Sequence, residues 1–340
     1  MQIFLKLLKV LTKGKGKIWG EKVLIYLKPL SIFPELHSDT LFGAITYAIS
    51  QLYPEKVDEM VKSFEDEPPF IISSTFPFIF KEDFENSEKI KFYPKIIFPQ
   101  KSKDLEEKYH PKDFKEYKKV KFIEENLFFD LLKGKLSESD ILRNYNQYTF
   151  IKGLLMMESY NIDVNFGENI IPNNSVNRIT NETEGIFYTS GNEFKNMGLF
   201  FLVEFMDGDY KPIVKAAIKF LKDRGFGRDI STGKGQFDYF IDEEYSLNHY
   251  GGNYFVTLSR FIPNSDDLAH INEFASYEID SKRGKSSSNE IRKQIRFFKE
   301  GSVFPDYKKY YGRNVSSGKV NPAIEYGFAF PLKCNLEEDK

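Results

Sequence analysis

Residues 198–241 indicate the fold class, because they divide into four consecutive segments whose sequence patterns each predict one kind of structure. They read GLFFLVEF at 198–205, YKPIVKAAIKFLKDR at 210–224, GFGRDISTGKG at 225–235 and QFDYFI at 236–241. The first is an almost unbroken apolar run, which is typical of a buried strand. The second places Ile213, Ala217 and Leu221 on one side of a helix. The order is therefore strand, helix, glycine-rich loop, strand.

The rest of the chain repeats this order. The run VLIYLKPL at 23–30 predicts a first strand, and residues 39–52 predict an amphipathic helix. Further strands are expected at 70–80, 91–98, 254–261, 295–298 and 323–332. This pattern predicts an α+β protein with two tandem ferredoxin-like units of βαββαβ order, an N-terminal one over 22–246 and a smaller C-terminal one over 247–340.

An internal repeat supports the two-unit interpretation. Residues 227–234 read GRDISTGK and residues 312–319 read GRNVSSGK, so five of the eight positions are identical. Duplicated units that carry the same loop explain such a match more simply than chance does.

Three segments lie outside the repeated pattern. Residues 1–21 form a basic N-terminal extension, and residues 100–146 are charged with a helical pattern, which predicts a helical insertion. Residues 161–184 are polar, rich in asparagine and weakly periodic. We expect a long loop or an extended hairpin there, and long loops in compact domains are often functional.

Composition narrows the class of protein. The chain has 340 residues, of which 41% are hydrophobic and 29% charged, so it predicts a globular protein of about two domains. The single cysteine, Cys334, excludes a disulfide framework, and the four histidines are scattered, so no metal or other cofactor is expected. An apolar run near the start is interrupted by Lys6 and Lys9, and no apolar span reaches about 20 residues. These features predict a soluble, cytoplasmic protein with no membrane partner.

Charge is distributed unevenly along the chain although its net value is only −2. Residues 1–28 carry seven lysines against one acid, and residues 281–299 carry seven cations against one acid. Residues 53–67 carry six acids against two lysines. Separate basic and acidic faces fit a member of an assembly that touches both a polyanion and other proteins, and solvated faces are the simpler alternative.

The glycine-rich loop at 225–235 is the most informative candidate site. Glycine permits positive φ, so successive backbone N–H groups can surround a phosphate while cationic side chains neutralise it. A P-loop is excluded because five residues separate Gly227 from Gly233 and the loop follows a helix; a dinucleotide-binding fingerprint is excluded because residue 230 is isoleucine. A flexible turn is the alternative. The candidate RNA-binding residues are Gly225, Gly227, Arg228, Ser231, Thr232, Gly233, Lys234 and Gly235, with Arg313 and Lys319 in the second copy.

Two further groups of residues are candidates. His37 and Ser38 open the first helix, where a histidine could be a general acid or base in RNA cleavage, the helix N-terminus could bind a phosphate, or Ser38 could simply cap the helix. No second acid–base residue is evident, so we assign no catalytic residue. Asn177 and Arg178 lie in a polar segment that could grip a sugar–phosphate backbone or form an ordinary surface hairpin.

Several motifs in this order resemble one family. They are HSDTLFGAI at 37–45, NRIT at 177–180 before Glu184 and Gly185, the glycine-rich loop, EGSVF at 300–304 and YGFAFP at 326–331. The chain resembles the fourth-subunit family of the Csm complex, the type III-A CRISPR effector, which belongs to the RAMP superfamily. The resemblance covers most of residues 22–332.

The resemblance implies a subunit without catalysis of its own that binds the single-stranded 5′ handle of the CRISPR RNA. It implies contacts with the large subunit that carries the Palm domain and with the backbone RAMP subunit. A thumb hairpin would fall at about 155–184 and shape the guide–target duplex, so target RNA would be touched indirectly. The phosphate-gripping role would fall on residues 225–235, with His37 and Ser38 near the handle.

Three other interpretations remain open at this point. The chain could be the equivalent subunit of a type III-B complex, or a CRISPR-RNA-processing endoribonuclease of the same superfamily that uses His37. It could also be a scaffold protein that does not contact RNA.

Overall fold

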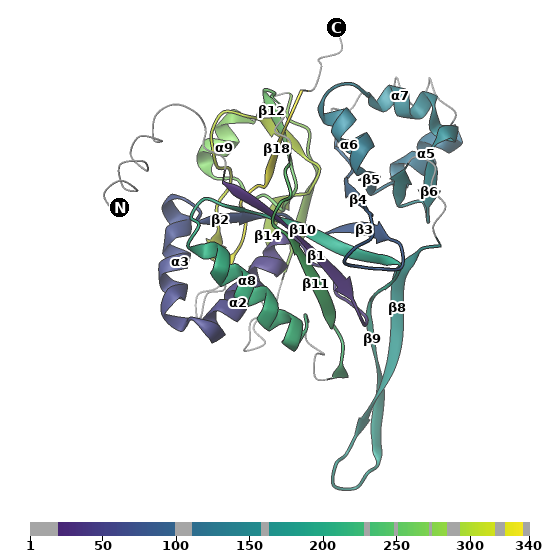
Figure 1. The fold of residues 1–340 in the computed structure, drawn as a ribbon, viewed down its shortest axis with the longest axis vertical. Coiled ribbons are helices and arrows are strands. Elements are labelled where there is room, and N and C mark those ends of the chain that lie inside the picture. Colours follow the sequence, from purple (N-terminus) through teal and green to yellow (C-terminus); the bar gives the residue numbers. More distant parts are fainter. Residues whose placement is uncertain are drawn as a thin grey trace.

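A nine-stranded sheet forms the centre of the molecule, in the order β11-β1-β10-β3-β4-β5-β7-β6 with β2 also paired to β10 (Figure 1). The computed structural model describes residues 20–98, 111–157, 163–227, 232–247, 251–271, 274–283, 293–316 and 324–335. The mixed α+β class predicted from the sequence is confirmed. The expected basic extension at 1–21 lies, except for its last two residues, outside the described residues.

The N-terminal part of the sheet is antiparallel throughout. It comprises β1 (Glu21–Pro29), β10 (Met197–Phe205), β11 (Phe237–Asp242), β2 (Phe70–Ile72) and β3 (Phe76–Phe80). Helix α2 (Ser38–Leu52) follows β1 in the connection to β2, and helix α8 (Tyr210–Arg224) connects β10 to β11. The two helices lie side by side against the sheet (Figure 1). All nine residues of β10 are buried, which explains why its sequence is apolar except for Glu204.

A small lobe extends the other end of the sheet. Its strands are β4 (Lys89–Pro94), β5 (Phe122–Glu124), β6 (Thr149–Ile151) and β7 (Leu155–Met157), and its helices are α5 (Pro111–Lys119), α6 (Glu125–Leu132), α7 (Glu138–Arg143) and the 3-10 turn at Tyr145–Gln147. The insertion predicted at 100–146 is therefore helical only in part, and its strands continue to Met157.

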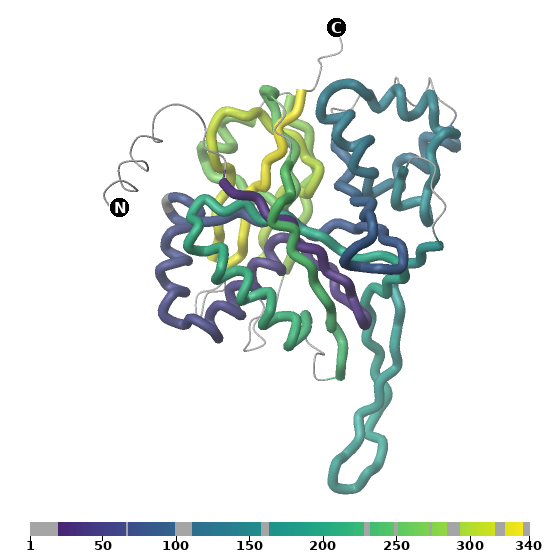
Figure 2. Tube along the Cα trace, viewed as in Figure 1, coloured from purple at the N-terminus to yellow at the C-terminus, as the bar shows by residue number. Residues whose placement is uncertain are grey.

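A long hairpin projects from the body of the molecule (Figure 2). It consists of β8 (Asn165–Val176) and β9 (Thr183–Lys195). The range of 155–184 expected for a projecting hairpin begins and ends about ten residues too early, since 155–157 is strand β7 of the lobe. The hairpin is mostly exposed on both faces, so its sequence lacks the alternation of a half-buried strand that would have marked its ends.

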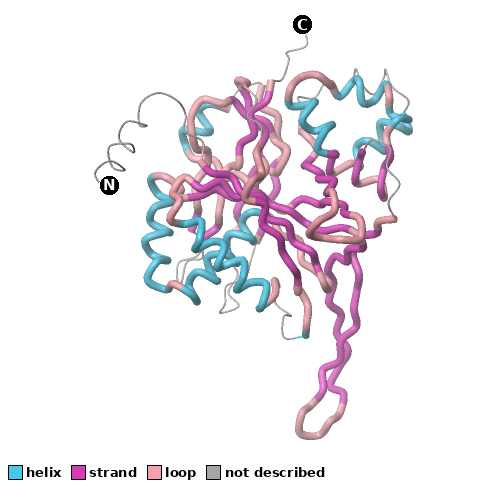
Figure 3. The backbone as a smooth tube through the Cα atoms, in the orientation of Figure 1, coloured by secondary structure: helices cyan, strands magenta, loops and turns pink. Residues whose placement is uncertain are grey.

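The C-terminal part is mainly strands and loops, with α9 (Ser265–His270) its one described helix (Figure 3). Its sheet has the order β15-β12-β18, and two small strand pairs accompany it. The strands are β12 (Tyr254–Thr257), β13 (Ile279–Lys282), β14 (Ile295–Phe298), β15 (Val303–Pro305), β16 (Val315–Ser316), β17 (Ile324–Glu325) and β18 (Pro331–Cys334). The strands expected at 254–261 and 323–332 are shorter than predicted or divided.

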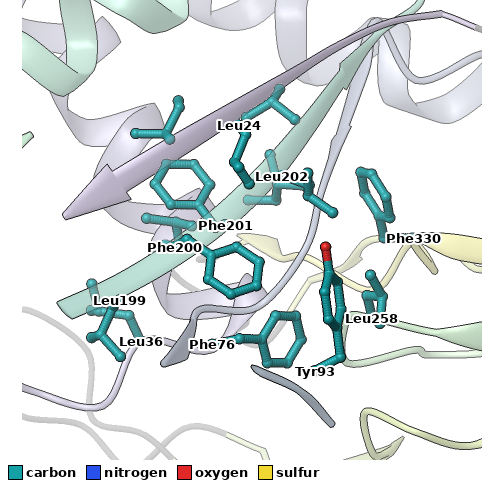
Figure 4. Close-up of a cluster of buried hydrophobic side chains, with 14 of the residues drawn as sticks. Leu24, Leu36, Phe76, Tyr93, Leu199, Phe200, Phe201, Leu202, Leu258 and Phe330 are labelled. Carbon is teal, nitrogen blue, oxygen red and sulfur yellow. The ribbon is translucent and has the colours of Figure 1, made fainter. Parts of the chain in front are cut away.

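The N-terminal and C-terminal parts share one hydrophobic core. Figure 4 shows Leu258 and Phe330 of the C-terminal part beside Phe76, Tyr93 and residues of β10. All of these side chains are almost completely buried. Because neither part encloses this core alone, we expect the two parts to unfold together.

Helix α3 (Pro54–Asp66) is an element that the sequence reasoning missed. Its charged residues were interpreted only as an acidic stretch, but Met60 and Phe64 are buried against the common core. Two apolar residues four positions apart suffice to hold one face of a helix, and the acids remain on the other face.

Gly301 joins the two parts at a point with no room for a side chain, and it provides a test of this packing. Its φ is +87°, and a Cβ would lie 2.2 Å from the carbonyl oxygen of Lys95. We expect Gly301→Ala to lower the free energy of unfolding by roughly 2–4 kcal/mol, measured by urea unfolding. Gly208→Ala is the matched control, because nothing lies within 4 Å of a Cβ there. Equal stability of the two variants would contradict this account.

Candidate nucleic-acid interface

The connector between β1 and α2, residues 30–37, brings the candidate segments together. The N–H of Gly235 in the glycine-rich loop donates to the carbonyl of Ile32 at 2.9 Å. Phe33 exchanges two backbone hydrogen bonds of 2.9 Å with Asn192 on the stem of the hairpin. The loop and the hairpin, which are distant in sequence, are therefore fixed to the same short segment.

The base of the glycine-rich loop is closed by an aromatic cluster. Phe226 is buried against Phe33 and Phe237, with ring centroids 5.5 Å and 5.0 Å away. Its N–H donates to the carbonyl of Gly235 at 2.9 Å, and a Cβ on Gly235 would lie only 1.7 Å from the carbonyl oxygen of Phe226. Gly235 is therefore required by the fold itself, because the two ends of the loop cross there without space for a side chain.

The other glycines give the loop its unusual backbone. Gly225, Gly227 and Gly233 have φ values of +89°, +105° and +80°, a region that favours glycine. At Gly227 and Gly233 a Cβ would meet nothing closer than 3.9 Å, so conformation rather than crowding selects glycine there. Thr232 is exposed. Arg228 and Ser231 lie outside the described residues, so the phosphate cradle remains a prediction.

Lys234 connects the glycine-rich loop to the hairpin. Its Nζ donates to the Oδ1 of Asn173 on β8 at 3.3 Å and to the hydroxyl of Thr189 on β9. Asn173 Nδ2 also donates to the Thr189 hydroxyl at 2.9 Å. A lysine that the sequence suggested as a phosphate ligand thus also anchors one face of the hairpin.

The two faces of the hairpin differ. Cross-strand partners share a face with residues two positions away, so the pairs Asn173–Phe187 and Ile171–Thr189 lie on the face that Lys234 touches. The opposite face carries an apolar stripe, which we define as Ile170, Pro172, Val176, Ile186 and Tyr188. Ile170, Ile186 and Tyr188 are 60%, 67% and 69% exposed, which is unusual for side chains of this size.

Asn177 and Arg178 lie at the far end of the hairpin. Asn177 shapes the turn, since its Oδ1 accepts the N–H of Ile179 at 2.9 Å and its Nδ2 donates to Glu184 at 2.9 Å. Arg178 is exposed at the tip, roughly 15 Å along the strand from Asn173. The structure therefore separates these two candidates from the glycine-rich loop.

His37 bridges the N-terminal and C-terminal parts. Its Nδ1 donates to the Oε1 of Glu300 at 2.9 Å, and its Nε2 lies 3.7 Å from the Oε2 of Glu35. Burial of the ring lowers the pKa of His37, but the contacts with Glu300 and Glu35 outweigh this effect and raise the pKa to about 9. Burial raises the pKa of the Glu300 carboxyl, and the hydrogen bond from His37 outweighs it, so that pKa is lowered. The pair is therefore ionised at neutral pH.

Ser38 does not cap helix α2, contrary to one of the sequence interpretations. His37 occupies the N-cap position without a side-chain cap bond, and the Ser38 hydroxyl instead accepts the N–H of Arg260 at 3.0 Å. The Arg260 side chain lies 3.3 Å from Asp39, and Lys282 also contacts Asp39. Burial would raise the pKa of Asp39, but Lys282 and Arg260 hold it below its usual value. The start of α2 is thus fixed to the C-terminal part.

The second copy of the glycine motif begins with the same backbone conformation as the first. Gly312 has a φ of +96°, close to that of Gly227. A Cβ on Gly312 would lie 2.1 Å from the carbonyl of Gly327, so this glycine marks a close approach of two segments. Arg313 is exposed, and Lys319 lies outside the described residues.

The residues that sequence reasoning missed are mainly the partners of His37 and Ser38. Glu300 belongs to the EGSVF motif, but nothing in the sequence indicates that it meets His37 across more than 260 positions. Arg260 and Lys282 carry no motif. In the described part of the chain, no group of histidine, cysteine or acidic side chains is arranged to hold a metal ion. Among the same residues, no helix is both long and apolar enough to span a membrane.

Comparison with known proteins agrees with the sequence motifs. Residues 251–334 match the family described as the CRISPR Csm4 C-terminal domain. The protein named CRISPR system Cms protein Csm4 from Thermococcus onnurineus (strain NA1) is 24% identical over 322 residues, which cover 93% of this chain and 98% of that protein. The resemblance to the fourth-subunit family of the Csm complex is confirmed. The fold of this chain is therefore compared with structures that contain Csm4.

Solved structures that contain Csm4 share the architecture. A chain of a Csm3–Csm4 subcomplex in the type III-A CRISPR-Cas interference complex matches with a TM-score of 0.65 and 19% identity, covering 92% of this chain and all of that one. A chain of a Csm1–Csm4 cassette in complex with AMPPNP matches with a TM-score of 0.57 and 20% identity, covering 93% and 99%. At these identities the likeness establishes the fold.

The ionised His37–Glu300 pair predicts a pH-dependent stability. A histidine whose folded pKa is raised to about 9 stabilises the fold fully below its unfolded pKa of 6.5, and this contribution is lost as pH rises toward 9. We expect His37→Gln to lower the free energy of unfolding by on the order of 2–3 kcal/mol near pH 6 and by much less near pH 10. Urea unfolding across this range measures the difference. A deficit that is the same at both pH values would contradict the ion pair.

Proposed function

We propose that this protein is a cytoplasmic, non-catalytic RNA-binding subunit of a type III-A CRISPR effector complex, and that it holds the 5′ handle of the CRISPR RNA. The observation that carries the proposal is the link from Lys234 to Asn173 and Thr189, which joins the glycine-rich loop to the hairpin. A backbone-gripping loop and a projecting arm can then act on one RNA strand in a fixed geometry. Single-stranded RNA is commonly bound in this way, through backbone contacts and stacking surfaces.

The topology supports two ferredoxin-like units. The strand order β11-β1-β10-β3, antiparallel throughout and with two crossover helices, has the βαββαβ arrangement. In the C-terminal part the order β15-β12-β18 follows the same plan with α9 as the only described helix. We infer that the unit at 22–246 is complete and that the unit at 247–340 is reduced.

We assign the thumb to the hairpin at 165–195. It projects from the body and carries the exposed apolar stripe (Figure 1). Its charged side chains are four acids and two cations, so its net charge is −2: Glu168, Arg178, Glu182, Glu184, Glu193 and Lys195. An acidic, apolar arm contacts bases or protein surfaces more favourably than phosphates, which is consistent with a wedge in the guide–target duplex.

Docking to a large Palm-domain subunit and to the backbone RAMP subunit is part of the proposal. It is supported by the solved relatives, in which Csm4 chains occur in a cassette with Csm1 and in a subcomplex with Csm3. The exposed acidic face of α3 is our candidate for one of these protein contacts.

The geometry around His37 favours a structural role over catalysis. Its raised pKa keeps the ring protonated at neutral pH, and its Nδ1 proton is directed at Glu300. A general base must be neutral, and a general acid must direct its proton at the substrate rather than at a buried carboxylate. The pair instead joins helix α2 to the C-terminal part.

The test is the binding and cleavage of labelled CRISPR RNA, with and without its 5′ handle, by the complex assembled with this chain. We expect the double variant Arg228→Ala, Lys234→Ala to lose about tenfold or more in affinity for handle-bearing RNA, because two cations near the backbone are removed. The slope of log Kd against log salt should fall by about 1 for each cation. No RNA cleavage should be seen in any variant.

The matched control is Lys56→Ala, Lys62→Ala, which removes two exposed lysines from helix α3 and should leave the affinity unchanged. Binding that does not depend on the handle would overturn the proposal and favour a scaffold protein. Cleavage that His37→Ala abolishes would overturn it and favour a processing nuclease.

A further inference from the structure

Helix α2 presents three exposed residues in register beside the glycine-rich loop. Thr40, Gly43 and Tyr47 are spaced by three and four positions, so they lie along one outward face of the helix. His37 stands at the head of this face. None of the three was a candidate in the sequence interpretation, and Tyr47 is 38% exposed.

Gly43 has no explanation within the fold. Glycine inside a helix is destabilising relative to alanine, so a packing or functional reason is expected for it. A Cβ at Gly43 would meet nothing within 4 Å, in contrast to Gly198, where it would lie 2.5 Å from the carbonyl of Leu27. The space above Gly43 is therefore open to atoms from outside the chain.

Tyr47 and Arg224 form a platform next to this space, since the guanidinium lies over the ring. The guanidinium carbon of Arg224 lies 4.6 Å from the centroid of the Tyr47 ring. Arg224 is the last residue of α8 and immediately precedes Gly225, so the platform adjoins the loop. A cation at the C-terminal end of α8 can stabilise that helix through its dipole without any further role. The Arg224 guanidinium instead lies on the Tyr47 ring of α2, and both residues remain exposed.

The surroundings favour a nucleotide over a protein segment. Thr40, Ser50 and Gln51 give the face a polar rim. A flat ring with a cation on it stacks a base and pairs with a phosphate, whereas an apolar helix would find little here to bury. An uncrowded glycine lets a sugar–phosphate chain approach the helix backbone.

We propose that the outward face of α2 is a nucleotide platform, in which one base stacks on the Tyr47–Arg224 pair while the RNA backbone passes over Gly43 toward the glycine-rich loop. This inference rests on the proposed function, since the RNA is taken to be the handle. It adds Gly43, Tyr47 and Arg224 to the RNA-binding surface.

The sharpest test uses Gly43, because a substitution there can separate folding from binding. We expect Gly43→Ala to raise the melting temperature of the protein, since alanine favours the helix and meets no neighbour. Gly43→Gln should leave the fold intact and lower the affinity of the assembled complex for handle-bearing CRISPR RNA about tenfold, by filling the open space. Gly208→Gln is the control, because a Cβ there also meets nothing within 4 Å, and it should bind like the wild type.

The platform itself is tested by conservative pairs. Tyr47→Phe should retain binding because it keeps the ring, and Tyr47→Ala should lose about 5- to 100-fold, the range for one stacked base. Arg224→Lys keeps the charge but not the plane, so it should also lose affinity, whereas Lys219→Ala should change it little.

The outcomes separate the two proposals. A wild-type complex without handle preference contradicts the proposed function and, with it, the platform. A wild-type complex that prefers the handle, together with Gly43→Gln and Tyr47→Ala variants that bind RNA equally well, overturns the platform alone. Variants that assemble poorly with the large subunit but keep their RNA affinity also overturn it, and assign the face to a protein partner.

Discussion

The backbone pairing between Phe33 and Asn192 is the constraint on which the candidate site depends. A connector outside the sheet must satisfy its own N–H and C=O groups, and this one does so with segments distant in sequence. Because the same connector also accepts the N–H of Gly235, it fixes the hairpin and the glycine-rich loop to one another. A Cβ on Gly191 would lie 2.1 Å from Ile32, so the stem can approach the connector only where it has no side chain.

Buried charge plays a comparable role between the N-terminal and C-terminal parts. The His37–Glu300 pair and the contacts of Asp39 with Arg260 and Lys282 all lie at the start of α2. Removing one partner of such a pair leaves the other charge buried and unpaired, so the pairs favour one arrangement of the two parts. The apolar core that both parts share supplies most of the stability, and the ion pairs fix how the two parts meet.

The elements that bury apolar residues were the easiest to predict from the sequence, and the exposed elements were the hardest. The strand at 198–205 and the helix at 39–52 were evident because their apolar residues repeat with the period of the structure. The hairpin ends were misplaced because β8 and β9 bury neither face, and α3 was missed because its charges concealed Met60 and Phe64. The glycine-rich loop was recognisable from local sequence, but the Lys234 contacts with Asn173 and Thr189 depend on tertiary proximity that no spacing rule reports.

The cations and the exposed apolar side chains of the candidate site lie on different elements, the glycine-rich loop and the hairpin. Cations gather at the root, where Lys234 and Arg224 flank the glycines, whereas the hairpin is net acidic and carries its apolar stripe on the face away from Lys234. In the proposed complex, contacts with RNA at the root would be electrostatic and would weaken with salt, whereas contacts made by the stripe would rest on burial of apolar surface and would not. A chain with a net charge of only −2 can therefore hold a polyanion at one point and reach an apolar surface at another, because the two properties occupy different elements.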